Sequence, residues 1–220
     1  MRIATFGCSW THGVGAIDKH FNWPLALSKL RPEWYIDNYA LGGSSLSFQL
    51  YCYNKAIKHN DYDKVIFQFT NPGRLTFFPE DHEVFDGHIN FTKNYKMFDI
   101  SDGFYRNINC ITMGHTSLPK NNSFWTSKEK YDLMKAYYST MPKEIYRAEY
   151  RAMVEYAEKR SSLCFFHNED VLKLNMYPVI NQEVINTGGK DMLDSFIADE
   201  GEHYNKAGCE WIAKWVLEKI

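Results

Sequence analysis

A serine near the N-terminus and a histidine near the C-terminus are the side chains best suited to do chemistry. Ser9 comes just after the apolar run Ile3–Phe6, and His203 lies in an acidic segment before the last helical pattern. A serine hydroxyl becomes a nucleophile when a base takes its proton, and imidazole is the natural base near neutral pH. The pair predicts acyl transfer through a serine, provided that the fold brings the two ends of the chain together.

Acidic residues next to His203 supply a third group for this chemistry. Asp199, Glu200 and Glu202 all lie just before the histidine in the chain. A carboxylate bound to the second ring nitrogen fixes the tautomer of the imidazole and stabilises its protonated form. Without such a partner, His203 would be an ordinary loop histidine beside a helix cap.

Two further segments offer donors for a developing oxyanion. Gly43 follows the second predicted strand, where paired glycines let main-chain N–H groups approach a ligand closely. Asn71 follows the third predicted strand and carries a donating amide. The same residues also suit ordinary turns, with Ser44 or Ser45 capping the next helix and Asn71 forming an Asx-turn.

Two more residues are candidates for contacts with a substrate. His12 is close to Ser9 in the sequence, and Arg74 lies just beyond Asn71. His12 would line the pocket and Arg74 would bind a substrate anion, although a surface ion pair is the more ordinary role for an arginine.

Short apolar runs that alternate with helical patterns must position these residues. Near-continuous apolar runs predict strands buried on both faces, and their alternation with helices indicates βαβ units. The predicted strands are Arg2–Phe6, Trp34–Asn38, Lys64–Phe69, Ser162–Phe166 and, more weakly, Met176–Ile180. Each candidate side chain follows a predicted strand or precedes a helix, at the sheet edge where open α/β folds bind ligands.

Helical spacing fills the gaps between these strands. Apolar residues recur at helical intervals in three segments: Leu46 to Ile57, Tyr146 to Ala157, and Ala207 to Val216. Ser139 or Thr140 is expected to cap the second of these helices, with Pro142 in its first turn, and Asn205 to cap the third. Residues 75–138 show no clear period, and we interpret them as an insertion after the third strand that shapes or covers the cleft.

Composition narrows the classes of function. The 220 residues are 45% hydrophobic, which suits one domain over residues 1–220. The net charge is −2 and the basic residues are scattered, so we expect no nucleic-acid partner. There is no C-x-x-C pair, and no cluster of cysteines and histidines has the spacing of a zinc site. No signal peptide or membrane span is apparent, so we expect a cytoplasmic protein, a virus-encoded one included.

Taken together, these segments resemble the SGNH (GDSL-like) hydrolase superfamily. The first block of that superfamily, Gly-Asp-Ser, is matched by Gly7-Cys8-Ser9. Its second block contributes a glycine, matched by Gly43, and its third an asparagine, matched by Asn71. Its last block, Asp-x-x-His before a C-terminal helix, is matched by Glu200 to His203.

This resemblance implies a three-layer α/β/α, flavodoxin-like fold with a parallel sheet of about five strands in the order 2-1-3-4-5. It implies ester hydrolysis through an acyl-serine, with the amides of Ser9 and Gly43 and the side chain of Asn71 as the oxyanion hole. It places Glu200 at the position of the acid, with Asp199 as the alternative. It implies that the reaction needs no metal and no organic cofactor. Pro72 stands where the family has aspartate, so Thr70 is an alternative to Asn71.

The expected substrate is a small-molecule or carbohydrate ester with a short acyl group, and the sequence does not indicate an oligomeric state. A different class of function is a non-catalytic protein on the same fold, used for glycan recognition or viral assembly. The large insertion and the non-standard third and fourth blocks favour that alternative. A Gly-x-Ser-x-Gly elbow in mid-chain and a dinucleotide-binding fingerprint are both absent from the sequence.

Overall fold

The computed structural model describes residues 1–13, 21–58, 60–70, 72, 74–76, 85–100, 110–112, 136, 140, 142–167, 177–198 and 203–220. For 74–76, 85–91, 99–100, 110–112 and 143 it describes the backbone alone.

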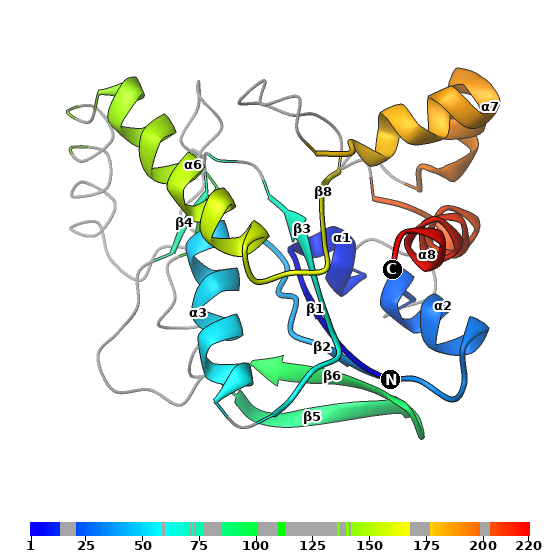
Figure 1. The fold of residues 1–220 in the computed structure, drawn as a ribbon. Coiled ribbons are helices and arrows are strands. Elements are labelled where there is room, and N and C mark those ends of the chain that lie inside the picture. The colour runs from blue at the N-terminus through cyan, green and yellow to red at the C-terminus, as the bar shows by residue number, and fades with distance from the viewer. Residues whose placement is uncertain are drawn as a thin grey trace.

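A six-stranded sheet in the order β5-β6-β2-β1-β3-β8 forms the centre of the fold (Figure 1). Its five parallel strands are β6 (Tyr95–Ile100), β2 (Tyr35–Asn38), β1 (Arg2–Phe6), β3 (Lys64–Phe69) and β8 (Leu163–Phe166). Strand β5 (Phe85–Thr92) is antiparallel to β6 at one edge. A separate two-stranded sheet pairs β4 (Arg74–Thr76) with β7 (Cys110–Thr112).

The predicted class and strand order are confirmed. The first four predicted strands lie in the order 2-1-3-4, as β2, β1, β3 and β8. In its described part, residues 177–180, the fifth predicted strand contributes one parallel bridge, between Val179 and Phe166, and the chain enters a helix at Ile180. An additional parallel strand, β6, comes from the segment predicted as an insertion and extends the sheet beside β2.

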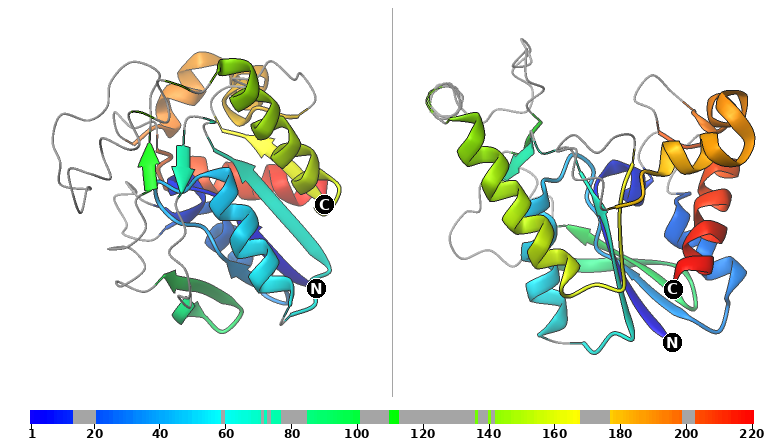
Figure 2. Two further views of the ribbon diagram at one scale, coloured as in Figure 1. Left: turned by 90° about the vertical axis from the view of Figure 1, so that its left-hand side faces the viewer. Right: turned by 45° about the horizontal axis from the view of Figure 1, so that its top comes forward.

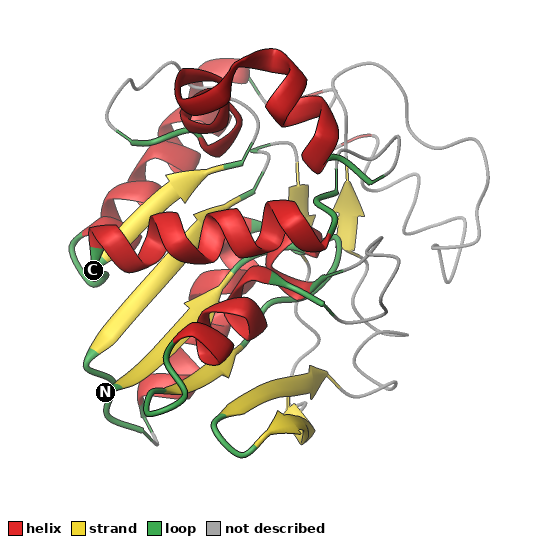
Figure 3. Cartoon of the chain, turned by 90° about the vertical axis from the view of Figure 1, so that its right-hand side faces the viewer, coloured by secondary structure: helices red, strands yellow, loops and turns green. Residues whose placement is uncertain are grey.

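Helices cover both faces of this sheet (Figure 2). On one face lie α3 (Leu46–Ile57) and α6 (Lys143–Glu158), and on the other lie α2 (Trp23–Leu30) and α8 (Lys206–Lys219). Figure 3 shows the second face, with α7 (Ile180–Phe196) at the end of the sheet toward which the parallel strands run. The one-turn helix α1 (Ser9–His12) follows β1 at that same end.

Two hydrophobic clusters, one on each face of the sheet, bury the side chains that point alternately to the two sides of each strand. Phe6, Phe67 and Phe166 pack with α3 and α6, whereas Ile3, Ile66 and Phe165 pack with α2 and α8. Each strand is buried on both faces, as the near-continuous apolar runs predict. The predicted core positions of Cys52, Cys164 and Cys209 are confirmed, since all three are buried and free of disulfides.

The helix starts agree with the sequence in part. Asn205 caps α8, as predicted, by accepting a hydrogen bond from the amide of Gly208. The predicted cap of α6 is wrong: that helix begins after Pro142 with no side-chain cap, and the Thr140 hydroxyl donates instead to the Ala136 carbonyl oxygen. Ser139 lies outside the described residues. On α8, Ala207 is exposed although its spacing predicted a place on the buried face.

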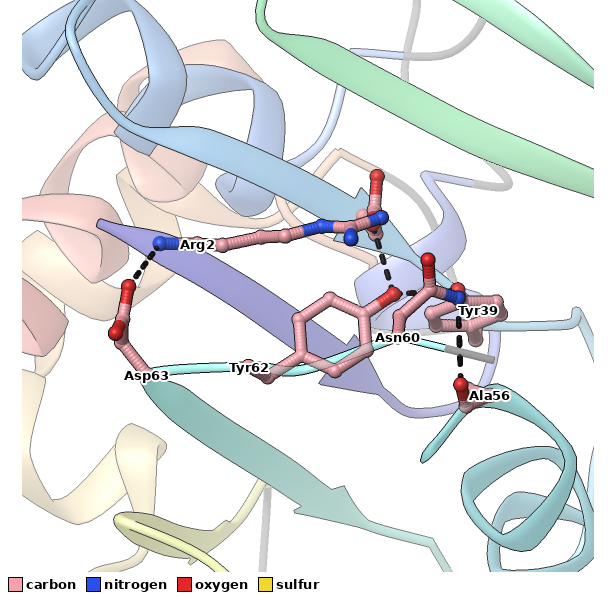
Figure 4. Close-up of polar contacts among 7 residues, drawn as sticks. Arg2, Tyr39, Ala56, Asn60, Tyr62 and Asp63 are labelled. Atoms are coloured by element: carbon pink, nitrogen blue, oxygen red, sulfur yellow. Dashed lines mark hydrogen bonds and ion pairs between the residues drawn. The ribbon is translucent and has the colours of Figure 1, made fainter. Parts of the chain in front are cut away.

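A polar cluster joins the starts of β1 and β3 to β2 (Figure 4). The Arg2 guanidinium lies 2.7 Å from the buried carboxylate of Asp37, which also accepts a 2.8 Å hydrogen bond from the Tyr62 hydroxyl. The hydroxyls of Tyr62 and Tyr39 are 2.6 Å apart, and the main-chain N–H of Arg2 donates to Asp63. The buried carboxylate is therefore paired, and the cluster has a structural role.

Candidate active site

The turn that carries Ser9 depends on the glycine before it. Strand β1 ends at Phe6, and α1 folds back so tightly that a Cβ on Gly7 would lie 2.1 Å from Thr11 Oγ1. Such an approach is open only to a residue without a side chain. Ser9 opens the helix at the carboxyl end of β1, as predicted, and is 7% exposed.

Helix α1 has one turn and would not persist alone, because a single turn gains too few hydrogen bonds for its conformational cost. Buried side chains bind the carbonyl groups at its end. Asn38 Nδ2 donates to the Thr11 carbonyl oxygen and Asn22 Nδ2 to that of His12, both at 3.0 Å. These amides satisfy carbonyl groups that have no partner within the helix.

The Thr11 side chain continues this network toward β8. Its oxygen accepts a 3.3 Å hydrogen bond from Trp23 Nε1, and its hydroxyl donates to Gln68 Oε1. Gln68 Nε2 lies 3.3 Å from Nδ1 of His167. Because all these residues are buried, each polar group needs its partner, and the network fixes α1 against β3 and β8.

A second branch of the network lies under the other side of α1. The Tyr95 hydroxyl donates to Asn22 Oδ1 at 2.8 Å and accepts from Asn38 Nδ2 at 3.0 Å. Burial raises the pKa of Tyr95 above its ordinary value, so this hydroxyl keeps the proton that it donates. The buried side-chain amides of Asn22 and Asn38, which bind the end of α1, are thereby held in one orientation.

The glycine turn after β2 is tied directly to the serine turn. The Gly7 carbonyl oxygen accepts hydrogen bonds from the Leu41 amide at 3.2 Å and from Ser44 Oγ at 2.9 Å. Gly43 has a φ of +74°, which favours glycine, and open space lies where a Cβ would point. Of the two predicted caps, Ser45 caps α3, while Ser44 holds the two turns together.

The loop that carries His203 is closed at its base. The amide of Ala198 donates to the His203 carbonyl oxygen, and that of Asn205 donates to the Phe196 carbonyl oxygen, both at 2.7 Å. The next residue, Tyr204, is buried, and its hydroxyl donates to Asn181 Oδ1. The backbone of His203 is therefore fixed on both sides.

Aromatic contacts bring the two ends of the chain together. The ring centroids of Trp10 and His203 are 6.4 Å apart, with a tilt of 52° between the planes. Trp10 directly follows Ser9 in the chain. The ring of His167 stacks face to face on the indole of Trp10, with ring centroids 3.7 Å apart and 7° between the planes.

The segment that follows β3 contains the third candidate donor to the oxyanion. Asn71 lies outside the described residues, whereas Thr70 and Pro72 on either side of it are buried. The Thr70 carbonyl oxygen accepts a hydrogen bond from the Tyr150 hydroxyl. Thr70 Oγ1 is buried and has no hydrogen-bond partner among the described residues, so Thr70 remains an alternative to Asn71 as a donor.

The remaining candidates have no described geometry that bears on their roles. Asp199 and Glu200 lie outside the described residues, and so does the side chain of Arg74, whose backbone pairs with Thr112 in the small sheet. His12 ends α1 and is half-buried. Among the described residues, no group of three acidic, histidine or cysteine side chains could hold a metal ion.

Sequence reasoning missed His167, Gln68 and Trp10. A signal for two of them is present, because Gln68 is a polar residue inside the apolar run of β3 and His167 directly follows the apolar strand β8. Side chains just beyond parallel strands meet at one edge, as for Ser9. The stacking of Trp10 on His167 depends on the spatial order of β1, β3 and β8.

Solved structures include proteins that are similar to this chain. No protein-family model and no curated protein matches this sequence. Among solved structures, the chain is similar to a provisionally assigned lipolytic protein of the G-D-S-L family from Desulfitobacterium hafniense DCB-2. The identity is 12% and the TM-score 0.49, over 100% of this chain and 99% of that one.

The part of the chain that the structure describes contains no helix that is both long and apolar enough to cross a membrane.

Proposed function

We propose that this protein is a serine ester hydrolase that works through an acyl-serine intermediate. The observation that carries the proposal is the meeting of the chain ends. Trp10, the residue after Ser9, is in aromatic contact with the ring of His203, although the two residues come from opposite ends of the sequence. A nucleophile and a base supplied by a strand end and a C-terminal loop form the arrangement that acyl transfer needs.

In this mechanism, His203 takes the hydroxyl proton as Ser9 Oγ attacks the carbonyl carbon of the ester. The oxyanion of the tetrahedral intermediate accepts hydrogen bonds from the amides of Ser9 and Gly43 and from Asn71 or Thr70. The intermediate collapses when His203 returns the proton to the leaving alcohol. Water then attacks the carbonyl carbon of the acyl-serine, while His203 takes a proton from the water and returns it to Ser9 Oγ. Asp199 or Glu200 orients the imidazole in both half-reactions.

The hydrogen bonds between the turns support these roles. Gly7, two residues before Ser9, accepts two hydrogen bonds from the segment that contains Gly43. The two glycine-containing turns therefore form one rigid unit, which suits donors that must be in place before the charge develops. Small acyl groups on a polar alcohol are the substrates that we propose, with a soluble ester as the first probe.

Replacement of the serine tests this proposal. Ser9→Ala should lower kcat for p-nitrophenyl acetate by about 10³-fold or more, because the nucleophile is lost while binding groups remain. Ser195→Ala, on the exposed surface of α7, is the matched control and should keep wild-type turnover. Wild-type turnover in a folded Ser9→Ala variant would show that Ser9 is not the nucleophile and that the proposal is wrong, whereas no turnover in the wild type would favour a non-catalytic binding protein.

A further inference from the structure

One buried histidine touches the chain neighbours of both proposed catalytic residues. The ring of His167 is 1% exposed and stacks on Trp10, which follows Ser9, at a centroid distance of 3.7 Å. The same ring meets Tyr204, which follows His203, edge-on at 4.8 Å and 62°. His167 therefore lies between the segment of the nucleophile and the segment of the base.

The orientation of this imidazole is set from beneath by a chain of hydrogen bonds. Trp23 Nε1–H donates to Thr11 Oγ1, which leaves the Thr11 hydroxyl proton to donate to Gln68 Oε1. The amide of Gln68 consequently presents its NH₂ group to His167 Nδ1, at 3.3 Å. The neutral ring then carries its proton on Nε2, and its plane is fixed by the amide as well as by the stacking.

We propose that His167 is a positioning residue of the site: its ring holds Trp10 and Tyr204 in place and thereby sets the approach of His203 to Ser9. The inference rests on the proposed function. In this role, a side chain that does not itself react sets the distance and angle for proton transfer between Ser9 and His203. Displacement of a catalytic group by about 1 Å is enough to lower a rate by about 100-fold.

A purely structural histidine would behave differently. Loss of such a residue would lower the free energy of unfolding and leave the turnover of the folded fraction unchanged. Val154 on α6 offers a matched control, since it is fully buried in the cluster on the opposite face of the sheet. Val154→Ala should reduce stability without reducing kcat.

Two substitutions separate the ring of His167 from its hydrogen bond. His167→Phe keeps a flat ring against Trp10 and removes the acceptor of Gln68. His167→Asn removes the ring and keeps an acceptor. We expect the Asn variant to lower kcat for p-nitrophenyl acetate about tenfold or more with KM nearly unchanged, and the Phe variant to stay within about threefold of wild type.

Tryptophan emission gives a readout that does not depend on turnover. The imidazole contact should alter the emission of Trp10, so His167→Asn should change the spectrum of the wild type and leave that of a Trp10→Phe protein unchanged. Wild-type kcat in a folded His167→Asn variant, or equal losses in the Asn and Phe variants, would overturn the inference. If Ser9→Ala keeps full turnover, the proposed function fails, and this inference fails with it.

Discussion

Gly7 is the residue on which the position of α1 depends most directly. Thr11 faces it across a gap that leaves no room for a methyl group, since an added Cβ would lie 2.5 Å from Thr11 Cβ. Thr11 has little freedom to yield, because its side chain and its carbonyl group are held by Trp23, Gln68 and Asn38.

Gly7→Ala should therefore lower the free energy of unfolding by about 1–3 kcal/mol, the usual cost of overpacking, and reduce ester turnover by moving Ser9. Gly188→Ala is the matched control. Its methyl group would overlap Met192 Sδ, at 2.2 Å, but the end of that flexible side chain can move aside. Urea unfolding and kcat measure both effects. Equal stability of the two variants would contradict this account of the turn.

For single residues, the sequence predicts positions at strand ends and helix caps better than it predicts contacts between distant segments. Ser9 at the end of β1 and Asn205 at the start of α8 follow from local pattern, because strand ends and helix caps are local features. The contacts of His167 with Trp10 and Tyr204 join three distant segments, and no local pattern encodes them. Asn71, Asp199 and Glu200 stay predictions.

The start of α8 packs closely against Tyr204 and Phe196, which lie on either side of His203 in the chain. A Cβ on Gly208 would lie 2.6 Å from Tyr204 Cδ1 and 3.0 Å from Phe196 Cβ. Tyr204 is buried and its hydroxyl is bound to Asn181, so the ring has little room to move. The helix thus packs directly against the residue that follows the proposed base.

Gly208→Ala should raise the intrinsic helix propensity of α8 by about 1 kcal/mol and still lower kcat about tenfold or more, because Tyr204 would displace His203. Glu210→Ala, at an exposed position of the same helix, should leave kcat unchanged. Steady-state kinetics with p-nitrophenyl acetate makes the comparison. An active Gly208→Ala protein would show that this packing does not position the base.

Elements with continuous apolar runs are the ones that the sequence predicts well. The bounds of β1 and β3 match their predictions, because both strands are buried on two faces. Strand β6 was missed in the presumed insertion although Tyr95 and Met97 alternate with partly exposed residues. Its place beside β2 is a matter of tertiary pairing, which a short alternating run does not reveal.

Across the whole molecule, buried thiols in both hydrophobic clusters couple stability to alkaline pH. Burial raises the pKa of the Cys164 thiol from 9.0 to about 12, and that of the Cys209 thiol from 9.0 to about 12. The unfolded chain therefore releases these protons at lower pH than the folded protein does. The stabilisation is fully present below pH 9 and is lost as pH rises toward 12.

Urea midpoints should accordingly fall as pH increases above 9. A Cys209→Ala variant should show a shallower decline, because one of the coupled groups is gone, even if its stability at pH 7 is lower. Parallel declines for wild type and variant would contradict the role of this thiol. The measurement also reports on the fold as a whole, since the two cysteines lie on opposite faces of the sheet.

Reaction with a fluorophosphonate tests the central claim most directly, because the reagent modifies a serine only where a base and oxyanion donors activate it. Mass spectrometry of the labelled protein should place a single adduct on Ser9, and His203→Ala should slow its formation about 10³-fold or more. An adduct elsewhere, no adduct at all, or an unchanged rate in folded His203→Ala would mean that the two ends of the chain do not form a common catalytic site.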